Sequence, residues 1–84
     1  MDRAEFQKLK LPDKAQYVFS VGKEMFTRNY LYFTIKCYSV PGFFAEIWYL
    51  PFANKIDRIV VLDSDDMLNI YDKQLDIREL LDKS

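Results

Sequence analysis

A period of two between Met25 and Leu62 limits the possible folds of this chain more than any other feature, because side chains of a β-strand alternate between its two faces. Two stretches, Pro41-Gly42 and Pro51–Asn54, interrupt the period with residues typical of tight turns. The pattern predicts an antiparallel meander of three strands, at about residues 30–39, 43–50 and 56–62. The preceding Met25–Asn29 either begins the first strand, with room for a bulge near Asn29, or forms a short strand of its own.

Helical signals precede the strands. Pro12 and Asp13 are typical of a first helical turn, and Gly22 is typical of the residue that follows a helix, so we expect a helix at about residues 12–21. Residues 2–9 predict one further helical turn, which either packs on the body of the protein or frays.

A helical pattern also follows the strands. Asp63 or Ser64 can cap a helix that begins with Asp65. Asp76, with Glu79 three residues later, resembles a capping box for a final turn. We therefore expect the chain to end in a C-terminal helical segment.

Together these elements predict one α+β domain over residues 1–84, with an N-terminal helix, a three-stranded antiparallel β-meander and a C-terminal helical segment. Residues 1–10 are the part that we expect to be loosely docked. Hydrophobic residues make up 50% of the chain and aromatic residues 17%, which is dense enough for so short a chain to build a core.

The pairing of the first two predicted strands leaves two registers open. In the register that we favour, Lys36 faces Glu46 and Ile35 faces Ile47, so that opposite charges share one face and apolar residues share the other. A two-residue loop would instead place Glu46 opposite Cys37, on the core face. The favoured register places Tyr32, Tyr38, Phe44 and Trp48 together on the face away from Ile35 and Ile47.

The charge balance and the single cysteine limit the partners and the compartment. A formal net charge of −1 provides no overall attraction to nucleic acid or to an anionic membrane. Cys37 has no second cysteine to pair with, and the N-terminal residues include acids and no apolar run typical of a signal peptide. We expect a cytoplasmic protein.

One segment carries a catalytic resemblance. Ile59–Asp65, an apolar strand that ends in Asp63-Ser64-Asp65, is similar to the first motif of haloacid-dehalogenase-type phosphatases, in which one aspartate attacks phosphorus and the other acts as acid and base. Met67 stands where that motif has threonine, and only nineteen residues follow Asp65. Because so few residues cannot complete the parallel sheet of those enzymes, helix capping explains the aspartates better.

The same acids do not fit a calcium loop. With Asp63 in the first position, the sixth position is Leu68 rather than glycine and the twelfth is Gln74 rather than glutamate. A loose cation site at Asp63, Asp65 and Asp66 stays an alternative to a solvated helix start.

No constellation in the sequence requires an enzyme. The chain has no histidine, which removes the commonest general base and most catalytic zinc sites. Cys37 lies in the middle of a strand and is interpreted as a buried small hydrophobe. We expect no catalytic residue, no cofactor and no metal.

The aromatic sheet face is the feature of the sequence that packing alone does not explain, and it is therefore the candidate binding surface. Its expected members are Tyr30, Tyr32, Tyr38, Phe44 and Trp48, interleaved with Lys36 and Arg28. We rank three interpretations: coverage by the helices of the same chain first, a homodimer or a partner protein second, and stacking of single-stranded nucleic acid a distant third.

Several segments resemble a group of small bacterial proteins of unknown function, over about residues 11–80. The similarity rests on a helix that ends at Gly22, on the aromatic-x-Arg pattern of Phe26–Arg28 and on the aromatic-Glu-aliphatic-Trp-Tyr strand Phe44–Tyr49. It implies a bacterial, cytoplasmic protein with the order helix, three strands, helix, and it implies no activity or ligand. Arg28 and Glu46 are the first candidates for a role beyond packing, with a charge network of Arg28, Glu46 and Lys36 as the alternative.

The sequence therefore predicts a small non-enzymatic module that binds another protein or itself. The alternative is a small-ligand-binding or accessory domain that uses Arg28, Glu46 and the sheet tyrosines. A flat apolar patch favours the first, and a pocket with converging polar groups favours the second.

Overall fold

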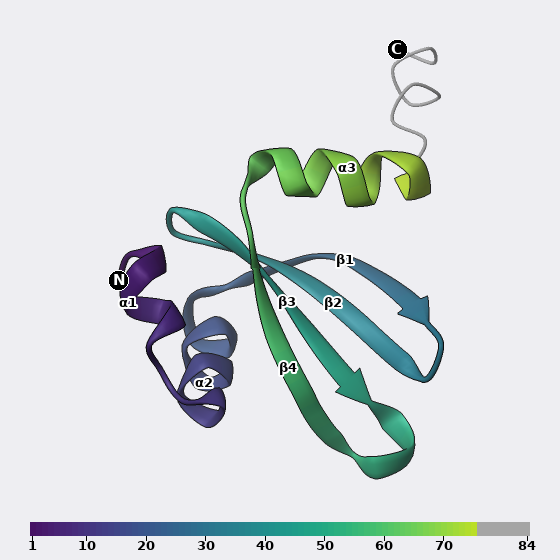
Figure 1. Cartoon of the computed structure of the whole chain (residues 1–84), viewed down its shortest axis with the longest axis horizontal. Helices are drawn as coiled ribbons and strands as arrows, with labels where there is room; N and C mark the ends of the chain where they lie inside the picture. Colours follow the sequence, from purple (N-terminus) through teal and green to yellow (C-terminus); the bar gives the residue numbers. More distant parts are fainter. Residues whose placement is uncertain (76–84) are drawn as a thin grey trace.

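The computed structural model describes residues 1–75 (Figure 1). In this part of the chain, two N-terminal helices precede a four-stranded antiparallel sheet of order β1-β2-β3-β4, and one helix follows it. The elements are α1 (Arg3–Gln7), α2 (Leu11–Val21), β1 (Lys23–Tyr30), β2 (Phe33–Val40), β3 (Phe43–Leu50), the 3-10 helix η1 (Pro51–Ala53), β4 (Lys55–Leu62) and α3 (Ser64–Leu75). The α+β class and the antiparallel meander are confirmed.

The prediction of three strands is wrong by one. The predicted strand at residues 30–39 is interrupted by a turn at Leu31-Tyr32, and residues 23–30 form the additional edge strand β1. The turn was missed because it contains no glycine or asparagine, although Leu31 adopts a left-handed φ of 54°. The bulge in β1 lies between Glu24 and Phe26 rather than near Asn29.

Both N-terminal helices pack on the body of the protein. The backbone N–H of Glu5 donates to Asp2 Oδ1 at 2.8 Å, which caps α1, and Phe6 of this short helix is fully buried. In α2, Val18 is fully buried, and the N–H of Gly22 donates to the carbonyl of Val18 at 2.7 Å. α1 is therefore docked through Phe6.

The helices cover opposite faces of the sheet. Phe6 and Val18 pack with Tyr38, Ala45 and Ile47, and this side is called the α2 face below. Met67 and Tyr71 of α3 pack instead with Cys37 and Leu62, on the α3 face. Figure 1 shows α3 crossing one end of the sheet, while the β1–β2 and β3–β4 turns extend beyond all three helices.

The favoured register of β2 and β3 is also wrong. Cys37 lies opposite Glu46, and Lys36 lies opposite Ile47, as in the register with a two-residue loop. Gly42 has a φ of 91°, so Pro41-Gly42 closes the turn alone and Val40 pairs directly with Phe43. The prediction paired Glu46 with Lys36, but the partner of Glu46 is Arg28 on β1.

A one-residue change of register moves side chains to the other face of the sheet. Ile35 therefore lies on the α3 face and Ile47 on the α2 face, not together. In the same way, Tyr38 lies on the α2 face and Trp48 on the α3 face, so the expected aromatic set is divided.

The start of α3 confirms the capping prediction. The N–H of Asp66 donates to Asp63 Oδ1 at 2.8 Å, and Asp66 Oδ2 accepts from the N–H of Asp63 at 3.1 Å, which is a reciprocal capping box. The second predicted capping box, at Asp76 and Glu79, lies outside the described residues. None of the helices in residues 1–75 is long and apolar enough to cross a membrane.

Candidate functional site

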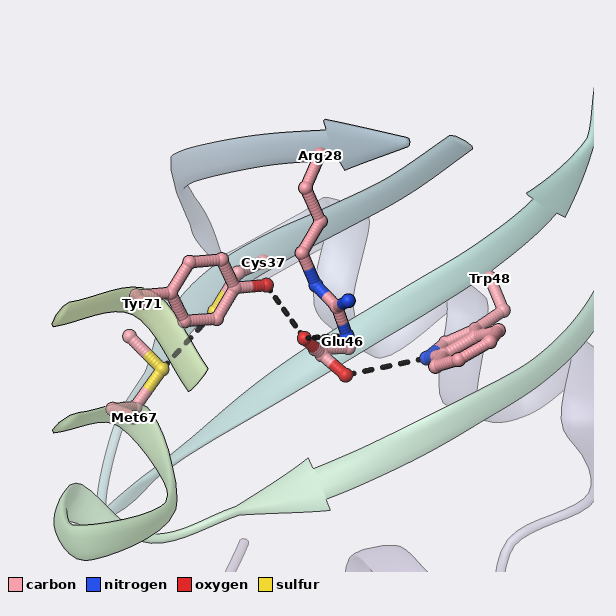
Figure 2. Close-up of polar contacts among 6 residues, drawn as sticks. All are labelled: Arg28, Cys37, Glu46, Trp48, Met67 and Tyr71. Atoms are coloured by element: carbon pink, nitrogen blue, oxygen red, sulfur yellow. Dashed lines mark hydrogen bonds and ion pairs between the residues drawn. The ribbon is translucent and has the colours of Figure 1, made fainter. Parts of the chain in front are cut away.

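Glu46 lies in the middle of β3 with 1% of its surface exposed, and three side chains donate to its carboxylate (Figure 2). Arg28 Nη2 donates to Oε2 at 3.1 Å, and the hydroxyl of Tyr71 donates to the same oxygen at 2.5 Å. Trp48 Nε1 donates to Oε1 at 3.2 Å. The donors come from β1, α3 and β3, so this cluster connects the edge strand, the centre of the sheet and the C-terminal helix.

A buried carboxylate is stable only when it is paired and hydrogen-bonded, because it loses its hydration. Both oxygens of Glu46 have partners, and the guanidinium of Arg28 supplies the opposite charge at 3.1 Å. Burial raises the pKa of Tyr71, and the hydrogen bond to Glu46 raises it further, so Tyr71 stays a donor at neutral pH. Burial lowers the pKa of Arg28, but contacts with Tyr71 and Glu46 outweigh this effect and leave its pKa raised.

An apolar layer surrounds the polar cluster. The ring of Phe26 stacks on Tyr71 with 4.9 Å between centroids, and the thiol of Cys37 lies 3.4 Å from Met67 Sδ. Cys37 is fully buried, and burial raises its pKa to about 11. The thiolate is the nucleophilic form of cysteine, so Cys37 is unreactive at neutral pH, as a buried small hydrophobe should be.

The chemistry of this cluster is that of a structural junction. Every oxygen of Glu46 that could accept a substrate proton already accepts an internal hydrogen bond. Within residues 1–71, whose side chains the structure describes, no group of three or more His, Cys, Asp or Glu residues is arranged to hold a metal ion. The cluster holds α3 on the sheet.

A second group of side chains lies beside the Glu46 cluster. It occupies the end of the α3 face that helix α3 does not cover. It consists of Tyr30, Phe33, Trp48 and Arg58 and is called the Trp48 surface below. The guanidinium of Arg58 lies 4.8 Å from the Trp48 ring, and Phe33 and Tyr30 meet the same ring edge-on at 5.1 and 6.2 Å. Trp48 is half-buried and Tyr30 is 52% exposed.

Large apolar side chains at the two nearby turns are still more exposed. Leu31 and Tyr32 in the β1–β2 turn are 77% and 75% exposed, and Phe52 in η1 is 76% exposed. The rings of Tyr32 and Phe52 meet edge-on at 6.3 Å, so the two turns are in contact. Exposed apolar side chains therefore lie both at the Trp48 surface and at the two turns that end these strands.

The structure brings only some of the predicted site residues together. Arg28, Glu46, Trp48 and Phe44 share the α3 face, whereas Tyr38 and Lys36 lie on the α2 face, and Tyr32 lies in a turn. Lys36 pairs with Glu24 at 3.5 Å rather than with Glu46, so the expected three-residue charge network is reduced to Arg28 and Glu46.

Sequence reasoning missed the contributions of Tyr71 and Arg58. The hydroxyl of Tyr71 gives no local sequence signal, because its acceptor, Glu46, is 25 residues away. The position of Arg58 within a strand could have indicated its role, because a long cationic side chain can cover an aromatic ring on the neighbouring strand, as Arg58 covers Trp48.

No protein-family model matches this chain, and neither the curated proteins nor the solved structures include a significant match. The resemblance to small bacterial proteins of unknown function therefore stays a prediction. The function has to be argued from the surfaces of the molecule.

Proposed function

We propose that this protein is a small non-enzymatic module that associates with a second copy of itself through the Trp48 surface. The observation that supports this most is the stack of Arg58 on Trp48, at 4.8 Å, beside a row of exposed apolar side chains. Tryptophan, tyrosine and arginine are the residues that most often dominate the binding energy of protein interfaces. Contiguous exposed apolar area of this kind is rare on monomers and is typical of interaction sites.

The charges of the surface favour a second copy as the partner. Arg58 Nε lies 2.7 Å from Asp57 Oδ2, so a cation and an anion lie side by side at its edge. In a two-fold symmetric contact the same patch meets itself, and a patch with both signs can satisfy each charge across the axis. A patch of one sign would repel its copy.

The backbone of the β1–β2 turn supports a role for its apolar side chains. Leu31 has a φ of 54°, a conformation that costs a residue with a branched side chain about 1–2 kcal/mol. Asparagine or glycine would relieve this cost at a solvent-exposed turn. A strained and 77% exposed leucine is consistent with a side chain that is buried in a complex.

The alternatives have less support. Arg28 and Glu46, the centre of the small-ligand alternative, pair with each other inside the protein, and Tyr71 and Trp48 donate the remaining hydrogen bonds to Glu46, which leaves only Arg28 Nε without a partner. Single-stranded nucleic acid requires aromatic rings that are free to stack, and one face of Trp48 is already covered by Arg58.

The experiment is sedimentation velocity of the full chain over a concentration series, with Leu31→Asn as the test variant. Wild type is expected to form a dimer at tens of micromolar, and Leu31→Asn is expected to be a monomer that is slightly more stable. Leu68→Gln is the matched control, because Leu68 is also exposed but lies on α3, and it should dimerise like wild type. A monomeric wild type, or equal dimerisation of all three proteins, would overturn the proposal.

A further inference from the structure

Trp48 belongs both to the Glu46 cluster and to the Trp48 surface. Its indole N–H donates to Glu46 Oε1 at 3.2 Å, while Glu46 Oε2 accepts from the hydroxyl of Tyr71. Figure 2 shows the carboxylate of Glu46 between Tyr71 on one side and Trp48 on the other. One carboxylate therefore connects the C-terminal helix to the central ring of the Trp48 surface.

Arg28 provides a second connection between the same residues. Its guanidinium carbon lies 5.6 Å from the centre of the Trp48 ring and 5.7 Å from the centre of the Tyr71 ring, and Nη2 donates to the shared Glu46 Oε2. Within the described residues, Arg28 Nε is buried without a hydrogen-bond partner. The position of the guanidinium therefore depends on Glu46 and on the two rings, and it should change when Tyr71 moves away.

Helix α3 can leave this face while the sheet stays intact. Among the α3 side chains that the structure describes, Met67 and Tyr71 are buried, whereas Leu68 is 59% exposed. The helix follows β4 directly after Asp63, so a change of backbone conformation near Asp63 would release it without breaking any strand pairing. Elements with few buried contacts open at a lower free energy than the whole domain unfolds.

We infer that docking of α3 controls self-association through the Trp48 surface, with Glu46 as the positioning residue between them. In the docked state, Tyr71 and Arg28 hold Oε2 of Glu46. Oε1 then stays at the indole N–H, and the ring keeps the orientation in which Arg58 stacks on it. In the undocked state water reaches the carboxylate and the ring gains rotamers, so association has to order the ring again and is weaker. This inference rests on the proposed function and adds its regulation.

Sedimentation velocity of the full chain tests the coupling with Tyr71→Phe, which keeps the ring and removes the hydroxyl. The dissociation constant of the dimer is expected to rise at least about fivefold, the low end of couplings between linked sites. Val18→Ala is the matched control, because it truncates a buried side chain on the α2 face and leaves every contact of Glu46 in place, and it should dimerise like wild type. A dimeric wild type with an equal dissociation constant for Tyr71→Phe would overturn this inference alone, whereas a monomeric wild type would overturn the proposed function as well.

The indole signal of Trp48, the single tryptophan of the chain, tests the connection without dimerisation. In the Leu31→Asn background, at a concentration at which sedimentation shows a monomer, Tyr71→Phe is expected to shift the NMR signal of the indole N–H and to speed its exchange with water. Val18→Ala in the same background should leave both unchanged. An indole signal that does not respond to Tyr71→Phe, or that responds equally to Val18→Ala, would contradict a path through Glu46.

Linkage requires the same coupling in reverse, because dimerisation must favour the docked helix by the factor by which docking favours dimerisation. Amide hydrogen exchange at Tyr71 should therefore slow as the wild-type concentration rises through the dimerisation range. Exchange at Tyr71 that is equally fast in monomer and dimer would contradict the coupling.

Discussion

Tyr71 on α3 and Glu46 on β3 are joined by a hydrogen bond of 2.5 Å that lies inside the protein (Figure 2). The C-terminal helix is therefore attached to the sheet by a polar contact as well as by the apolar packing of Met67 and Tyr71. The same carboxylate receives Arg28 from the edge strand. A substitution of Tyr71, Glu46 or Arg28 should therefore weaken the packing of α3, β3 and β1 together.

Tyr71→Phe removes one of the three donors and keeps the ring that stacks on Phe26. The expected loss is about 1–3 kcal/mol of unfolding free energy, because Glu46 Oε2 then has only Arg28 as a partner. Urea denaturation followed by circular dichroism measures this loss. Tyr32→Phe is the control, since Tyr32 is 75% exposed, and it should stay within about 0.5 kcal/mol of wild type.

Glu46→Ala should be more harmful, because it leaves the guanidinium of Arg28 largely buried without its counter-charge. Breaking a buried ion pair by removing one partner costs about 3–5 kcal/mol. A double variant, Glu46→Ala with Arg28→Met, should recover part of this loss. If the double variant is as unstable as the sum of the two single variants, Arg28 and Glu46 are not coupled as the structure indicates.

The unfolding free energy should fall at alkaline pH. Burial raises the pKa of Cys37 from 9.0 to about 11, so between these values the unfolded chain releases a proton that the folded chain keeps. The contribution of Cys37 is therefore complete below pH 9 and is lost as the pH rises to about 11, and the raised pKa of Tyr71 acts in the same direction. Denaturation midpoints between pH 8 and 11 test this, and Cys37→Ala should reduce the slope. An equal slope in both proteins would contradict the assignment to Cys37.

The sequence was sufficient to predict the elements whose signals are local. Helix α2, the turn at Pro41-Gly42 and the cap at Asp63 follow from residues within one or two turns of each other. The register of β2 on β3 could not be predicted in this way, because it depended on a partner for Glu46 that lies 18 residues away. The choice of Lys36 as that partner was reasonable locally, but it placed Glu46 on the wrong face.

The candidate surfaces depended on that register. The aromatic set was predicted to lie on one face, and the one-residue shift placed Tyr38 on the α2 face and the half-buried Trp48 on the α3 face. A groove between Ala15 of α2 and Ile47 of β3 gave no sequence signal, because these residues are brought together only by the packing of α2 on the sheet.

The cap of α3 gives a test at acidic pH. The hydrogen bond from the N–H of Asp66 lowers the pKa of Asp63, so its contribution to stability is present above the ordinary value of 3.8 and is lost as the pH falls through the lower folded value. Asp63→Ala should destabilise the protein at neutral pH and weaken its response to acid in this range. Asp57→Ala is the control, because Asp57 is also an exposed carboxylate but caps no helix. Equal acid responses of the two variants would contradict the role of Asp63.

Gly22 tests how closely the C-terminal end of α2 approaches Tyr38 of β2. Its φ of −82° suits any residue, but a Cβ on Gly22 would lie 2.4 Å from the carbonyl oxygen of Val18 and 3.3 Å from Tyr38 Cβ. Because Val18 is fully buried and its carbonyl accepts the N–H of Gly22, the backbone cannot move aside without loosening the core. Gly22→Ala is therefore expected to cost about 1–3 kcal/mol, the usual range for overpacking, in a thermal or urea denaturation. Ser20→Ala, two residues earlier at an exposed position of α2, should be neutral within about 0.5 kcal/mol. If Gly22→Ala is instead neutral or stabilising, as it would be at an ordinary helix end, the close contact between α2 and the sheet is not present in solution.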